Sequence, residues 1–228
     1  MKETSSDLHG NAPDESPVAL LLIDVINDFE FDEGAEELFQ FALPAAKKIA
    51  ALRQRAMDAG IPTIYVNDNF GKWRSDFRAQ VAHCIDENTR GRPIAELLKP
   101  GTDDYFVLKP KQSGFYSTTL DLLLQHLGAR TLILSGFSAD ICVLFTAIDA
   151  HLRDYHLMIP RDCVASQRQS ENERVLQYLE RVLEAEIKSS DEIDLQSLRE
   201  QPEGLPESSR WSERSGDQRE RVETRGAP

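Results

Sequence analysis

Hydrophobic residues along this chain gather in short runs separated by longer polar or amphipathic stretches. The first run, VALLLI at 18–23, contains no polar position, which is typical of a parallel strand covered on both faces. Four later runs of strand-forming residues have a similar character: 63–66, 105–108, 131–135 and 157–160. The pattern therefore predicts five strands.

Between these runs, apolar residues recur every three or four positions, the spacing of an amphipathic helix. The predicted helices cover 41–59, 77–85, 120–127, a stretch from 140 onward and 171–185, and 91–100 is expected to be a connector with one short turn. Gly60 and Gly128 provide helix stops. Strands that alternate with helices predict a three-layer α/β/α, Rossmann-like fold. Its mainly parallel sheet would have five or six strands and right-handed crossovers.

The two ends of the chain depart from this pattern. Residues 1–16 are polar and lack the basic start and apolar stretch of a signal peptide. Residues 188–228 are rich in charged residues, Gln, Ser, Gly and Pro, a composition that does not bury enough surface to order itself. We therefore expect one folded domain at 17–187 between two disordered tails.

An acidic composition narrows the classes of partner. The 228 residues carry a formal net charge of -13 without a basic stripe, so a nucleic-acid or anionic-membrane partner is not expected. No stretch approaches the roughly 20 apolar residues of a transmembrane helix. The cysteines, Cys84, Cys142 and Cys163, are odd in number and show no paired spacing, so a disulfide framework is not expected. We expect a cytoplasmic protein.

The stretch 131–153 organises the candidate chemistry. An apolar strand is expected to break at Gly136 and to restart as a helix from Asp140, which would place Cys142 in the first helical turn. Unpaired backbone N–H groups and the positive end of the helix dipole favour a thiolate there. In an open α/β sheet, this strand-to-helix turn is also where ligands bind.

Reactive side chains follow three of the predicted strands, all at the carboxyl edge of the sheet: Asp24, Lys109 and Cys142. Together they suit nucleophilic catalysis, in which the thiolate attacks a carbonyl, the carboxylate moves the proton and the ammonium stabilises negative charge. Backbone N–H groups around Ser138 and Cys142 would stabilise the oxyanion.

Other interpretations stay open at this point. Cys142 fits an inert buried cysteine equally well. Asp24 fits equally well as a residue whose carboxylate only caps the loop after its strand. Asp28 could fill that role in its place. Lys109 and Lys111 have the same side-chain parity, so the pattern does not distinguish them.

Three segments in order, LLIDVINDF, VLKPKQSGFYSTTL and LSGFSADICVLFTAIDA, resemble the isochorismatase-like cysteine hydrolase superfamily, which includes nicotinamidases. The likeness covers roughly 17–187. It implies an Asp-Lys-Cys catalytic triad of Asp24, Lys109 and Cys142, and so chooses Lys109 over Lys111. It also implies a cis peptide bond between Phe137 and Ser138 that directs the N–H groups of Ser138 and Cys142 at the oxyanion.

Two departures from the superfamily narrow the expected activity. Metal-dependent nicotinamidases have an Asp-x-His pair after the second strand, where this chain has NDNFGKW and keeps only Asp68 as a possible ligand. We therefore expect no metal and no cofactor. True isochorismatases cleave a vinyl ether and lack the cysteine, so Cys142 indicates an amide, ureido or carbamoyl substrate.

The substrate pocket, the oligomeric state and the alternative functions complete the expectations from the sequence. Four residues after the second strand are candidates either for the substrate pocket or for a structural loop: Asn67, Asn69, Phe70 and Trp73. The resemblance implies a homo-oligomer. The alternatives to C–N bond hydrolysis are an isochorismatase-type ether hydrolase and a non-catalytic interaction protein that binds its partner through the acidic tail.

Overall fold

A parallel sheet forms the centre of the molecule. The computed structural model describes residues 15–71 and 76–200. Within these ranges the strands are β1 (Val18–Ile23), β2 (Thr63–Asp68), β3 (Tyr105–Lys109), β4 (Thr131–Phe137), β5 (His156–Met158) and β6 (Val164–Ala165). Their order is β3-β2-β1-β4-β5, β6 pairs with the end of β4, and every pairing is parallel. The predicted parallel sheet is confirmed.

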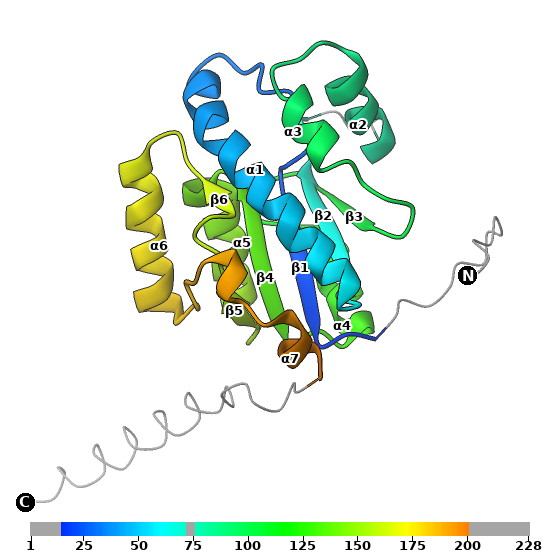
Figure 1. Cartoon of the computed structure of the whole chain (residues 1–228), viewed down its shortest axis with the longest axis vertical. Helices are drawn as coiled ribbons and strands as arrows, with labels where there is room; N and C mark the ends of the chain where they lie inside the picture. The colour runs from blue at the N-terminus through cyan, green and yellow to red at the C-terminus, as the bar shows by residue number, and fades with distance from the viewer. Residues whose placement is uncertain (1–14, 72–75, 201–228) are drawn as a thin grey trace, which may run out of the picture.

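Helices cover both faces of this sheet, as Figure 1 shows. One face packs against α1 (Ala35–Asp58), α2 (Phe77–Asp86), α3 (Arg92–Leu97) and the C-terminal α7 (Leu195–Glu200). The other face packs against α4 (Leu120–Leu127), α5 (Leu144–His151) and α6 (Gln169–Leu183). The predicted three-layer α/β/α architecture is therefore confirmed.

The uninterrupted apolar run of β1 has its expected cause. Alternate side chains of a strand point to opposite faces, so a strand covered on both sides needs apolar residues throughout. Val18, Leu20 and Leu22 belong to the core under α1. Ala19, Leu21 and Ile23 belong to the core under α4 and α5. β1 is thus the central strand of the molecule.

Strand ends differ from the sequence prediction because pairing partners set them. β2 continues to Asp68 and β3 to Lys109, since these two residues pair with each other at the end of the ladder. β4 does not break at Gly136 but runs on to Phe137. Gly136 has φ +118, and a Cβ there would lie 2.0 Å from the carbonyl oxygen of Ile23, so only glycine fits between these strands.

The helices agree more closely with their predicted bounds. α1 ends just before Gly60, which adopts φ +68 as expected of a left-handed stop. It begins at Ala35 rather than at residue 41, and it accommodates Pro44 in its interior. The strand β6 was not predicted, because it has two residues and is defined by its pairing with the end of β4.

The C-terminal segment is the main departure from the predicted domain boundary. Residues 190–192 form a short 3-10 turn with a capping box between Ser189 and Glu192, and α7 follows. Ile193 and Leu195 are only 3% and 4% exposed, in the core under α1. The prediction that the chain is disordered from residue 188 is therefore wrong for 188–200. The predicted N-terminal tail 1–16 is wrong at Ser16, which is 1% exposed and donates its N–H to the Leu127 carbonyl oxygen. Residues 1–14 and 201–228 lie outside the described residues.

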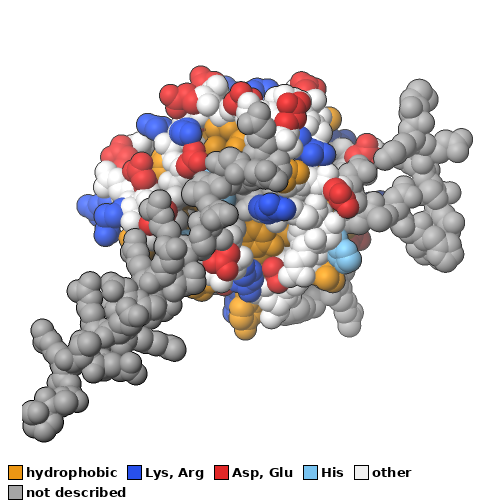
Figure 2. Space-filling model, turned by 90° about the horizontal axis from the view of Figure 1, so that it is seen from below, with side chains coloured by type: hydrophobic (Ala, Val, Ile, Leu, Met, Phe, Trp, Pro, Cys, Tyr) orange, Lys and Arg blue, Asp and Glu red, His pale blue; other side chains and the backbone are white. Residues whose placement is uncertain are grey.

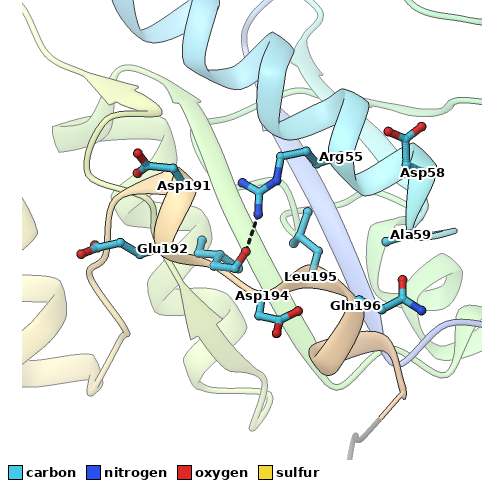
Figure 3. Close-up of a pocket in the computed structure, with 9 residues that line it drawn as sticks. Arg55, Asp58, Ala59, Asp191, Glu192, Asp194, Leu195 and Gln196 are labelled. Atoms are coloured by element: carbon cyan, nitrogen blue, oxygen red, sulfur yellow. Dashed lines mark hydrogen bonds between the residues drawn. The ribbon is translucent and has the colours of Figure 1, made fainter.

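Arg55 on α1 fastens this segment to the rest of the molecule. Its guanidinium donates to the carbonyl oxygen of Ser190 over 2.7 Å and also to that of Ile193. Figure 3 shows Arg55 pointing from α1 toward the segment that carries Glu192 and Asp194, across an open depression. This depression lies by the C-terminal end of α1, at the amino edge of the sheet.

The molecular surface at this end is mixed in charge. Figure 2, seen from the side on which α7 lies, shows acidic and basic side chains interspersed, with hydrophobic side chains between them. Among the helices within 15–71 and 76–200, none combines the length and the apolar character needed to cross a membrane.

Candidate active site

Three strand ends meet at the opposite, carboxyl edge of the sheet. Asp24 directly follows β1, Lys109 is the last residue of β3, and Cys142 lies in a helical turn after β4. β1 lies between β2 and β4, and β3 lies beyond β2. Since adjacent strands are about 4.8 Å apart, the β3 backbone is about 10 Å from β1, and a long lysine side chain can cross β2.

The three side chains converge. The Lys109 Nζ atom lies 2.8 Å from Asp24 Oδ2 and 3.5 Å from Cys142 Sγ. A second carboxylate, Asp68 Oδ2, lies 3.4 Å from the same nitrogen. The structure therefore brings together the residues that the sequence singled out, and their catalytic roles stay a prediction.

Burial distinguishes the two candidate lysines. Lys109 is 0% exposed, whereas Lys111 is exposed. A buried ammonium is stable only when it is paired with negative charge, and Asp24 and Asp68 provide that charge. The geometry thus places Lys109 in the cluster, in agreement with the resemblance.

The backbone at Asp24 holds its carboxylate in place. Asp24 has φ +51, in the left-handed region that aspartate tolerates better than most residues. Its N–H donates to the Val66 carbonyl oxygen over 3.0 Å, and its Oδ1 accepts from the Asp68 N–H over 2.6 Å. The other oxygen faces Lys109, so both carboxylate oxygens have partners.

The charges of the cluster determine its proton positions. Burial raises the pKa of Asp24, although the Lys109 ammonium opposes this. Burial alone would lower the pKa of Lys109, but Asp24, Cys142 and Asp68 outweigh it and the net shift is upward. Lys109 is therefore a stable cation and Asp24 a stronger base than an ordinary carboxylate.

The pKa of Cys142 differs from the sequence prediction. Burial raises the pKa of the thiol, Asp24 raises it further, and Lys109 only partly opposes them. This shift is opposite in direction to the one expected from the sequence, because the sequence pattern does not show that the sulfur is partly buried beside a carboxylate.

Cys142 lies in a π-helical turn, Ala139–Val143, rather than at the start of a regular α-helix. The Val143 N–H donates to the Ser138 carbonyl oxygen, five residues earlier, over 3.2 Å. Such wider turns are rare and occur often at functional sites. The helix α5 continues directly from this turn.

Ser138 marks the entry to this turn. The bond between Phe137 and Ser138 is a cis peptide, as the resemblance implied. The Ser138 hydroxyl donates to Asp140 Oδ1 over 2.6 Å. An oxyanion hole made by the N–H groups of Ser138 and Cys142 stays a prediction.

The predicted pocket residues divide into three groups. Asn67 is 0% exposed, and its amide bonds to both the N–H and the carbonyl oxygen of Ile26, so it braces the loop after β1 and does not line an open pocket. Asn69 and Phe70 follow β2, and the Asn69 N–H donates to the Lys109 carbonyl oxygen over 3.0 Å. Their role in the pocket stays a prediction. Trp73 lies outside the described residues.

Asp68 is the charged member that sequence reasoning missed, because it was considered only as a metal ligand. The signal lies in the register: Asp68 pairs with Lys109 across neighbouring strands. No group of three or more His, Cys, Asp or Glu side chains within 15–71 and 76–200 is arranged to hold a metal ion.

Known proteins are similar to this chain in sequence and in fold. The model of the Isochorismatase domain family matches residues 18–190. This chain belongs to the isochorismatase family of hydrolases.

Individual relatives agree with this assignment. An uncharacterised isochorismatase family protein of Bacillus subtilis, YaaI, is 42% identical over 175 residues, which is 77% of this chain and 95% of the relative. The ureidoacrylate amidohydrolase RutB of Methylorubrum extorquens is 25% identical over 65% of this chain and 70% of its own. The crystal structure of N-carbamoylsarcosine amidase from Thermoplasma acidophilum superposes with a TM-score of 0.61 at 31% identity, covering 78% of this chain and 98% of that one.

Proposed function

We propose that this protein hydrolyses the C–N bond of a small amide, ureido or carbamoyl compound through a thioester on Cys142. The observation that carries this proposal is the cluster in which the Lys109 ammonium lies 2.8 Å from Asp24 and 3.5 Å from the Cys142 sulfur. A sulfur, a base and a fixed cation within contact distance are the groups that this chemistry needs.

In the first half-reaction, the Cys142 sulfur attacks the substrate carbonyl carbon while Asp24 accepts the thiol proton. Because the pKa of the thiol is raised, the proton leaves during the attack rather than before it. Lys109 stays charged and stabilises the negative charge on the sulfur and the carboxylate. Asp24 then returns the proton to the leaving nitrogen, which departs as an amine or ammonia.

In the second half-reaction, water attacks the thioester carbon and gives one proton to Asp24. The C–S bond breaks, the acid product leaves, and Asp24 returns the proton to the sulfur. The cycle consumes one water and needs no electron transfer. The backbone N–H groups of Ser138 and Cys142 are the donors that we assign to the oxyanion in both steps.

The named activities of two relatives support the substrate class. RutB is named an amidohydrolase of a ureido compound, and the Thermoplasma protein an amidase of an N-carbamoyl compound. Both names describe hydrolysis of a nitrogen-bound carbonyl group.

A substrate screen tests the proposal. Purified protein is incubated with nicotinamide, N-carbamoylated amines, ureido acids and isochorismate, and released ammonia or amine and pyruvate are measured. We expect turnover of at least one C–N compound, loss of that turnover after treatment with iodoacetamide, and no effect of a chelator. Turnover of isochorismate alone, unchanged by iodoacetamide, would reject the proposal in favour of ether hydrolysis.

A further inference from the structure

We propose that Thr146 is a positioning residue for the nucleophile: its buried hydroxyl fixes the backbone of Cys142 and ties it to the loop that follows Lys109. Thr146 lies in α5, one turn after Cys142, and is 0% exposed. Its hydroxyl bonds to backbone groups of Cys142 and Gly114, so it would act on the cluster through Cys142.

The Thr146 hydroxyl uses both of its hydrogen-bonding capacities. Its Oγ1 donates to the Cys142 carbonyl oxygen over 2.7 Å and accepts from the Gly114 N–H over 3.0 Å. A hydroxyl carries one proton and two lone pairs, so a single side chain satisfies a donor and an acceptor from different segments. Serine could make both bonds, whereas valine, of nearly the same shape, could make neither.

The bond from the Gly114 N–H connects Thr146 to the segment that carries Lys109. Gly114 lies in the loop between β3, which ends at Lys109, and α4. A Cβ at Gly114 would lie 2.7 Å from Val66 Cγ1 and 3.5 Å from Thr146 Cγ2, so the loop backbone packs directly against these side chains. The neighbouring Ser113 hydroxyl donates to the Asp149 carboxylate, which is a second hydrogen bond between this loop and α5.

These bonds connect the two segments that carry the sulfur and the ammonium. Cys142 and Lys109 come from strands on opposite sides of β1, and their side chains lie 3.5 Å apart. A π-helical turn lacks the regular hydrogen-bond spacing of an α-helix, and a threonine hydroxyl can bond the carbonyl four residues earlier. The bond from the Thr146 hydroxyl to the Cys142 carbonyl oxygen therefore helps to hold the backbone of this turn in one conformation. Small displacements of a reacting group reduce rate strongly.

The test compares Thr146→Val and Thr146→Ala with the conservative Thr146→Ser. The first readout needs no substrate: the rate at which iodoacetamide labels Cys142, followed at peptide level from pH 6 to 10. We expect the labelling profile of the valine and alanine variants to shift to lower pH, toward that of an ordinary thiol, because the sulfur is less well held in the buried cluster. The serine variant should follow the unmodified protein.

The second readout, kcat and KM, rests on the proposed function and uses a substrate found in the screen. We expect kcat to fall by about 10- to 100-fold in the valine variant, with KM changed by less than about threefold, and serine to restore most of kcat. A purely structural role would lower the melting temperature without moving the labelling profile.

Two results would overturn the inference: valine and alanine variants that label and turn over like the unmodified protein, or a serine variant as impaired as valine. If the valine variant does not fold, the alanine variant, which removes the same hydroxyl without adding volume, decides the matter. The labelling result stands even if the proposed function fails, so the two failures are distinguishable.

Discussion

At the scale of single residues, the site depends on a lysine held between two carboxylates. Lys109 is fully buried, and it keeps its proton because Asp24 and Asp68 lie within 2.8 and 3.4 Å of its nitrogen. Burial raises the pKa of the Cys142 thiol, and the carboxylate that stabilises the lysine raises it further. The site therefore combines a thiol of raised pKa, a charged amine and a carboxylate of raised pKa.

Removal of the Asp24 charge should affect labelling and turnover in opposite directions. Because Asp24 raises the pKa of the Cys142 thiol, Asp24→Asn should shift iodoacetamide labelling of Cys142 to lower pH. The unmodified protein should still gain labelling rate above pH of about 9, since a raised thiol pKa delays formation of the thiolate. Turnover by the variant should fall by about 100-fold or more, because the base is lost.

Asp28→Asn is the matched control for this variant. Asp28 is in the same loop after β1, but its carboxylate pairs with His83, 3.1 Å away, and not with the cluster. It should leave both the labelling profile and turnover nearly unchanged. Equal labelling profiles in Asp24→Asn and the unmodified protein would show that Asp24 does not control the thiol.

The sequence identified the residues of the cluster but not its proton state. Reactive residues after predicted strands can be found from the sequence pattern, which identified Asp24, Cys142 and a lysine at 109 or 111, and the family resemblance chose Lys109. The function of Asp68 depends on its pairing with Lys109, which a single strand does not reveal. The pKa of Cys142 depends on burial and on a carboxylate that is distant along the chain, so the direction of its shift could not be predicted from the sequence pattern.

At the scale of elements, the close contact of β1 and β4 sets the position of the nucleophile. Gly136 lies opposite Ile23 in this pair, and the cysteine turn begins shortly after β4 ends. A side chain at Gly136 would collide with the Ile23 backbone and push β4 away from Asp24. The glycine is therefore a requirement of the strand pair and not a strand breaker.

Gly136→Ala should destabilise the fold well beyond the cost of a left-handed backbone. We expect a loss of about 3 kcal/mol or more in the free energy of unfolding, because the backbone must move. Gly128→Ala is the control: it also has positive φ, but a Cβ there meets no atom within 4 Å, so it should cost only about 1 kcal/mol. Urea unfolding of both variants measures the difference, and equal losses would contradict the role assigned to Gly136.

Apolar runs and periodicity were enough to predict the strands β1 to β5 and most helices. The errors within the sheet share a cause: the ends of β2, β3 and β4 and the existence of β6 depend on pairing with the neighbouring strand. The π-helical turn at Cys142 has no distinct apolar period, and so its segment was predicted to be a regular helix.

At the scale of the whole molecule, the C-terminal segment completes the layer that contains α1. Asp162, after β5, accepts from the Ser190 N–H over 2.7 Å and from its hydroxyl over 2.8 Å. Arg55 bonds the same segment from α1. The average composition of 188–228 does not reveal this, because two buried apolar residues within a charged stretch are enough when partly buried polar side chains, Arg55 and Asp162, bond the backbone that lies between them and the domain. The S-x-x-E pattern at Ser189 was the available sequence signal.

Replacement of Ile193 and Leu195 together by alanine should therefore destabilise the full chain. Loss of two buried side chains should lower the free energy of unfolding by about 3–6 kcal/mol. Gln196→Ala, at an exposed position of α7, is the control and should change it by less than about 0.5 kcal/mol. Thermal or urea unfolding measures both, and a double variant as stable as the control would show that this segment is not part of the core.

The homo-oligomer implied by the resemblance stays a prediction at this scale, and sedimentation of the purified chain measures its oligomeric state.

The central claim concerns one atom, the sulfur of Cys142. The most direct measurement is kcat of Cys142→Ala, at matched folding by thermal unfolding, on a substrate from the screen. The account predicts a loss of at least about 1,000-fold, because a thioester needs a sulfur and the Cys142 sulfur is the one that lies beside Lys109. A Cys142→Ala variant that turns over within about tenfold of the unmodified protein would contradict it.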